Sequence, residues 1–84
     1  MEWKRLKRRH IRVSAFTNIK IELNVYIEGR YVVAMVDTYS IGQNEYSVVS
    51  FHAEYKSREV AEDAYKKLDN ILDTLVELKG AEVI

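Results

Sequence analysis

The sequence predicts a small α+β protein in which an antiparallel meander of three or four strands carries one long C-terminal helix packed on one face. Three observations predict this fold: a segment that alternates apolar and polar residues, two further strand-like segments bounded by glycine-containing turns, and a final segment with helical periodicity between a serine and a glycine. We expect one domain, 1–84, because no linker, internal repeat or low-complexity segment interrupts the 84 residues.

Basic residues crowd into the beginning of the chain. Residues 1–12 hold six Lys or Arg and one acid, for a net charge of +5, and the remainder carries −5. This asymmetry is typical of proteins that contact nucleic acid or another anionic surface. We expect residues 1–8 to form a basic arm or a short helical turn, with strands over 9–55. Two other interpretations stay open: an edge strand protected by its charge, or a segment that pairs with the protein's own acidic helix, in the same chain or in a partner.

The segment IKIELNVYIE, residues 19–28, alternates with period two, and its odd-numbered positions are apolar. This pattern is typical of a half-buried strand. The same phase extends back to Ile11, but one straight strand over 11–28 would be about 60 Å long, twice the roughly 30 Å expected for a domain of this size. We therefore expect a three-residue turn at Thr17-Asn18-Ile19 that pairs Ile11 with Val25. A long bent strand that pairs with another subunit is the alternative.

A tight hairpin turn is predicted at Glu28-Gly29-Arg30, followed by YVVAMVDTY, residues 31–39, which is apolar on both faces like a central strand. A two-residue turn at Glu28-Gly29 places Lys20 opposite Asp37, a favourable pair. A turn at Gly29-Arg30 has better turn chemistry but places Glu22 opposite Asp37. Both registers put the same side chains on each face of the sheet.

The next strand is NEYSVVSFHAEY, residues 44–55, whose inner face we expect to carry Val49, Phe51, Ala53 and Tyr55. The helix is predicted over residues 58–79. Ser57 is a favourable N-cap, and Gly80 is a favourable C-cap because glycine adopts the left-handed conformation readily.

Two apolar surfaces exceed what this fold can bury. The apolar residues of the helix cover an arc of about 160°, wider than the roughly 100° that a one-sided helix needs. Four strands make a surface about 19 Å wide, which one helix about 10 Å across does not cover. We therefore expect a homodimer. The outer sheet face is predicted to display these residues: Phe16, Tyr26, Tyr31, Val33, Met35, Tyr39, Tyr46, Val48 and His52.

The predicted function is non-catalytic binding, with the basic N-terminal segment in contact with DNA or RNA. The candidate nucleic-acid-binding residues are Lys4, Arg5, Lys7, Arg8, Arg9, Arg12, Lys20, Tyr26 and Tyr31. The alternative is a protein-interaction or assembly module, with the basic segment against an acidic protein partner. The candidate interface residues, drawn from the aromatic sheet face and the helix, are Val33, Met35, Tyr46, Val48, Tyr65, Leu72 and Val76.

Several other functions are disfavoured by the composition. Cysteine is absent, which excludes a disulfide and a thiolate site, and the two histidines, His10 and His52, are too few for a histidine-based zinc site. No phosphate-binding glycine loop, dinucleotide fingerprint or nucleophile elbow occurs. We expect no catalytic residue, no metal and no cofactor. Because no run of about 20 apolar residues and no signal peptide is present, we expect a cytoplasmic protein without a membrane span.

Overall fold

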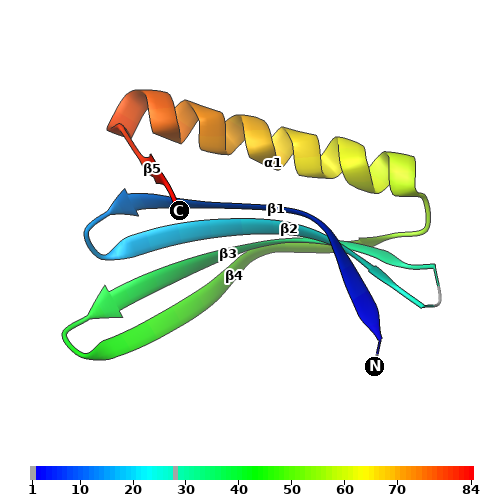
Figure 1. Ribbon diagram of the computed structural model, residues 1–84, viewed down its shortest axis with the longest axis horizontal. Coiled ribbons are helices and arrows are strands. Elements are labelled where there is room, and N and C mark those ends of the chain that lie inside the picture. The colour runs from blue at the N-terminus through cyan, green and yellow to red at the C-terminus, as the bar shows by residue number, and fades with distance from the viewer. Residues whose placement is uncertain (1, 28) are drawn as a thin grey trace.

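The computed structural model describes residues 2–27 and 29–84 and shows one antiparallel sheet with a helix across one face (Figure 1). The elements are β1 (Trp3–Ser14), β2 (Thr17–Tyr26), β3 (Tyr31–Ile41), β4 (Asn44–Tyr55), α1 (Arg58–Lys79) and β5 (Glu82–Val83). The strands lie in the spatial order β4-β3-β2-β1-β5. The predicted α+β meander with a C-terminal helix is confirmed, and β5 is an addition that the sequence pattern did not predict.

Helix α1 has the predicted bounds because both of its caps form. Ser57 is extended, and its side-chain oxygen accepts a hydrogen bond from the Val60 N–H at 3.4 Å. Gly80 adopts the left-handed conformation, φ 64°, and donates its N–H to the Val76 carbonyl. Among the described residues, no helix combines the length and apolar character needed to cross a membrane.

The basic segment is a strand. β1 begins at Trp3, which lies opposite Tyr26, and it pairs with β2 along its whole length. The prediction of an arm or helical turn over residues 1–8 is therefore wrong for residues 3–8, which are built into the sheet; Met1 lies outside the described residues.

The turn between β1 and β2 also differs from the prediction. It lies at Ala15-Phe16 and not at Thr17-Asn18-Ile19. The Phe16 N–H donates to the Ser14 hydroxyl at 3.2 Å, a local bond that stabilises such turns. A register shift just before Ser14 then lets Ile11 lie opposite Ile19, so a two-residue turn keeps the apolar positions on one face.

The register between β2 and β3 corrects both predicted registers. Tyr26 N–H donates to the Arg30 carbonyl, and Gly29, with φ 75°, donates to the Tyr26 carbonyl. Leu23 consequently lies opposite Val33, so odd-numbered residues pair with odd-numbered ones. Either predicted two-residue turn would have paired odd with even positions. The loop contains an odd number of residues and not the predicted two, because Gly29 accommodates the positive φ of a longer turn.

This register moves predicted outer-face residues to the helix side of the sheet. Val33 is fully buried there, and Tyr31 and Met35 pack against the same core. The residues of β3 and β4 that pair with this series, Tyr39, Tyr46 and Val48, share the same side.

In β4 a register shift at Ser50 reverses the alternation. Phe51, Ala53 and Tyr55 lie on the helix side as predicted, whereas Val49 lies on the opposite face.

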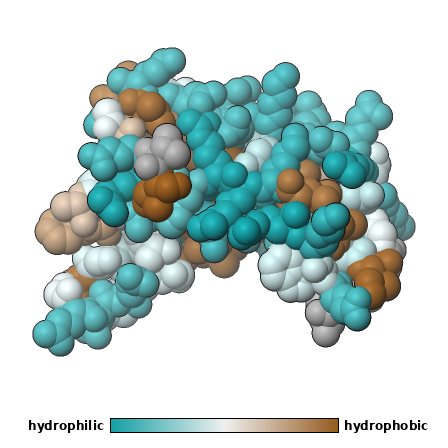
Figure 2. Space-filling view, viewed as in Figure 1, coloured by the Kyte–Doolittle hydropathy of each residue, from teal (hydrophilic) through white to brown (hydrophobic). Residues whose placement is uncertain are grey.

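The core lies between α1 and the first three strands. Its buried members are Ile11, Ile21, Leu23, Val33, Ala61, Tyr65, Leu68 and Leu72. β4 is covered only near its C-terminal end, and every residue from 41 to 50 is exposed. Figure 2 shows that the molecule is hollowed on the side away from α1, between two projecting ends. One end is the β3–β4 hairpin, and the other contains the start of β1 (Figure 1).

Candidate nucleic-acid interface

The alternation of β1 divides the basic segment between the two faces of the sheet. Successive strand residues point to opposite sides, so neighbours in sequence have different surroundings. Lys7 and Arg9 share the helix side with Ile11. Arg8, His10 and Arg12 lie on the opposite side, which we call the outer face.

Acidic residues of α1 bind the helix-side cations. Lys7 Nζ lies 3.2 Å from Glu62 Oε2 and 5.7 Å from the centre of the Tyr65 ring. The hydrogen bond from Lys7, together with one from Arg58, lowers the pKa of Glu62.

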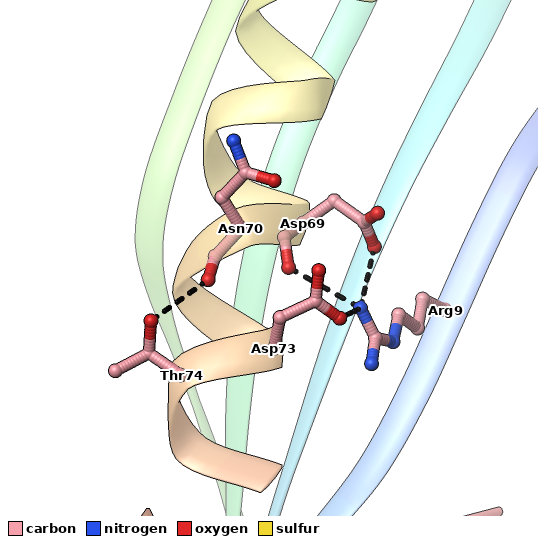
Figure 3. Close-up of polar contacts among 5 residues, drawn as sticks. All are labelled: Arg9, Asp69, Asn70, Asp73 and Thr74. Atoms are coloured by element: carbon pink, nitrogen blue, oxygen red, sulfur yellow. Dashed lines mark hydrogen bonds and ion pairs between the residues drawn. The ribbon is translucent and has the colours of Figure 1, made fainter. Parts of the chain in front are cut away.

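Arg9 makes more hydrogen bonds to α1 than Lys7 does, and Figure 3 shows its guanidinium beside Asp69 and Asp73. Its Nη1 donates to Asp69 Oδ1 at 2.8 Å, to Asp73 Oδ1 at 2.6 Å and to the Asp69 carbonyl at 3.2 Å. The hydrogen bond to Asp69, and to a smaller extent the one to Asp73, raises the pKa of Arg9 above its usual value. The arrangement attaches α1 to β1, and it confirms for Lys7 and Arg9 the interpretation that basic residues pair with the protein's own helix.

The outer-face cations have fewer acidic partners. His10 lies opposite Lys20 in the β1–β2 pair, with Arg8 and Arg12 on either side. Burial, followed by the positive charges of Arg8, Lys20 and Arg12, lowers the pKa of His10. We call these four residues, Arg8, His10, Arg12 and Lys20, the outer cationic cluster.

Acidic side chains compensate only part of the positive charge of the outer cationic cluster. Arg12 Nη1 lies 3.9 Å from Glu82 Oε2, at the limit of an ion pair, and both side chains are largely exposed. Within the described part of the chain, no ion pair involves Arg8 or Lys20. Nearby Glu22 is engaged by Arg5 at 3.6 Å. The outer face therefore carries a local excess of positive charge.

The other predicted nucleic-acid residues are dispersed. Lys4 lies opposite Val25 at the exposed beginning of β1. Tyr26 lies on the outer face, with the Arg30 guanidinium 5.5 Å from its ring centre. Tyr31 lies on the helix side, so it does not share a surface with Tyr26 as the sequence analysis expected.

Most of the predicted interface residues are not on the surface. Val33, Tyr65 and Leu72 belong to the core of the single chain, and Met35 and Val76 pack against that core. Only Tyr46 and Val48 are exposed, on the β3–β4 hairpin. These residues are buried, and not exposed as predicted, because of the β2–β3 register and the side of α1 that meets the sheet.

Three residues of this region, Asp69, Asp73 and Trp3, were not among the predicted site residues. The first two are four residues apart, so a helix places both carboxylates on one face, and that spacing is a readable signal. Trp3 was assigned to the expected arm, and only the extension of β1 brings it opposite Tyr26.

No group of three or more His, Asp or Glu side chains suited to a metal ion occurs in residues 2–27 and 29–84. Comparisons with protein-family models, with curated proteins and with solved structures found no match for this chain.

Proposed function

We propose that this chain is a non-catalytic binding protein that contacts nucleic acid through the outer face of its sheet. The supporting observation is the division of the basic segment. Lys7 and Arg9 are neutralised by α1, whereas among the described residues no ion pair involves Lys20 or Arg8, whose cross-strand neighbour Glu22 is engaged by Arg5. The original set of candidate cations thereby narrows to three members of the outer cationic cluster, Arg8, Arg12 and Lys20.

The excess of positive charge is local to the outer face, since the whole chain has a formal net charge of 0. Crowded cations repel one another, and a polyanion relieves that repulsion while it releases its own condensed counterions. Neutralisation of about three phosphates on a single strand corresponds to a slope near −2 in a plot of log affinity against log salt concentration. The hollow in Figure 2 lies on the side of the sheet away from α1, which is the side of the outer face.

A fluorescence-anisotropy titration with labelled DNA and RNA at two salt concentrations tests the proposal. Lys20→Ala and Arg8→Ala should each weaken binding by several-fold on every sequence, and they should lower the salt dependence. Lys66→Ala is the matched control, because it removes one exposed positive charge from α1 and leaves the outer face unchanged. Absence of binding at about 50 mM salt, or equal losses in Lys66→Ala and Lys20→Ala, would contradict the proposal.

A second candidate function, self-assembly, is favoured by the exposed edge of β4. The strand is 12 residues long and carries exposed Tyr46, Val48 and Val49. The strand contains no lysine or proline, residues that commonly protect an edge strand, so its free edge is suited to pairing with another strand. The proposed occupant is β4 of a second copy, in antiparallel orientation, and the sedimented mass at micromolar concentration tests it.

A further inference from the structure

The start of β1 places two aromatic rings on the face that carries the outer cationic cluster. Trp3 and Tyr26 are direct partners in the antiparallel β1–β2 pair, so their side chains share one side of the sheet. Trp3 is 53% exposed, although tryptophan is usually well covered in folded proteins. Together with Glu2 and Lys4 the two rings line a shallow depression at the end of the strands.

The aromatic pair and the cations follow one another along the same two strands. From Trp3, the outer-face positions of β1 continue through Arg5 to Arg8, and those of β2 run from Tyr26 to Lys20. One side of Tyr26 is already close to Arg30, at 5.5 Å from the ring centre. Trp3 is therefore the more accessible stacking surface, and the outer cationic cluster, which begins at Arg8 five residues farther along β1, is suited to a phosphate backbone.

We infer that Trp3, supported by Tyr26, stacks on unpaired bases, so that the ligand of the outer face is a single strand. This inference rests on the proposed function, to which it adds the strandedness of the ligand and a specific contact. Exposed aromatics on a sheet stack with bases that are splayed out of a helix, whereas paired bases in a duplex are stacked on one another and do not present their faces. Every base has such a face, so the contact is tolerant of sequence.

Trp3 also provides the readout, because it is the only tryptophan in the sequence. Its fluorescence is measured during titration with a single-stranded oligothymidylate, with a duplex of the same length, and with an abasic oligomer that keeps the sugar–phosphate chain but lacks bases. The single strand should quench the fluorescence and bind more tightly than the other two. In anisotropy titrations with labelled oligomers, which do not depend on tryptophan fluorescence, Trp3→Ala should weaken oligothymidylate binding by at least about fivefold, the lower end of measured stacking contributions. It should leave the abasic affinity unchanged.

Phe16→Ala is the matched control, since Phe16 is 67% exposed at the other end of the β1–β2 hairpin. Trp3→Tyr should restore most of the affinity, and circular dichroism checks that each variant keeps its fold. Equal affinity for the abasic and base-containing strands, with unchanged fluorescence, would overturn the stacking inference and leave the cationic interface standing. Failure of all three polymers to bind at about 50 mM salt would overturn both proposals.

Discussion

Arg8 and Arg9 are adjacent in the sequence and have opposite roles in the structure. Arg9 donates to two carboxylates of α1, whereas Arg8 faces away from the helix and lies beside His10, with Arg8 Nη2 3.4 Å from the His10 Nδ1. The cause is the two-residue period of a strand. The position of a basic residue in that alternation decides which face of the sheet it lies on, and the local density of charge in the sequence does not. A count of basic residues overestimates the available cations because it includes those already paired.

The pKa of His10 depends on the positive charges of the outer face. Burial and the neighbouring Arg8, Lys20 and Arg12 lower its pKa from the usual 6.5, so the unfolded chain takes up a proton at higher pH than the folded one. The His10 contribution to stability is therefore complete above about pH 6.5 and is lost as the pH falls from there through the folded-state pKa.

An NMR titration of the His10 ring should give a pKa below 6.5 in the free protein. Arg8→Ala should move that pKa upward, because it removes the first of the three neighbouring positive charges. A bound polyanion should also move it upward. A pKa at or above 6.5 in the free protein would show that the cations are not crowded around the ring.

At the scale of the elements, the Arg9 contacts join β1 to the middle of α1, 60 and 64 residues later in the chain. The side chain of Arg9 is only 23% exposed, so its hydrogen bonds are better shielded from water and salt than those of a surface pair. We therefore expect this contact to stabilise the packing of α1 on β1.

Arg9→Ala should lower the free energy of unfolding by about 1–2 kcal/mol, since charge-assisted hydrogen bonds are lost and Asp69 and Asp73 are left close to each other. Arg8→Ala is the control and should change stability by less than about 0.5 kcal/mol. Urea denaturation of both variants measures the difference. Equal effects would mean that the Arg9 contacts contribute nothing particular to stability.

The elements themselves were largely predictable, and their registers were not. The helix bounds follow from Ser57 and Gly80, whose cap chemistry acts within one turn of the chain. The β2–β3 register depends on whether the loop around Gly29 adds an even or odd number of residues, and several loops suit the same glycine. That difference of one residue moved Val33 from the predicted outer face into the core.

At the scale of the whole molecule, one helix does not cover the sheet, as the sequence analysis predicted. The side of α1 that faces the edge of β4 carries Val60, Ala64 and Lys67, and helical spacing places Ile71 on the same side, 49% exposed. Antiparallel pairing of two β4 strands would bring this side of each helix toward its symmetry mate. Asp63 and Lys67 on this side already pair with each other within each helix, at 3.1 Å, so the exposed apolar residues and the edge of β4 are the surface that a second copy would cover.

The self-assembly candidate predicts that the native chain sediments at about twice the 9.9 kDa of a single copy. Ile71→Lys should shift the mass to that of one copy without unfolding the chain, because it places a charge in the apolar side of α1 that would meet the partner. Ile27→Lys is the matched control, since Ile27 is 71% exposed at the β2–β3 loop, away from the edge of β4. A single-copy mass for the native chain would contradict the candidate.

The sequence by itself determined the order of strands and helix, the helix bounds and the segregation of charge, because these depend on periodicity, caps and composition within short stretches. Only the tertiary structure decided which cations are available. The physical reason is that Arg9 and its carboxylate partners are about 60 residues apart in the chain and meet only after α1 packs on the sheet. The register of the β1–β2 pair placed Trp3 beside Tyr26, and the position of α1 on the sheet left the edge of β4 exposed.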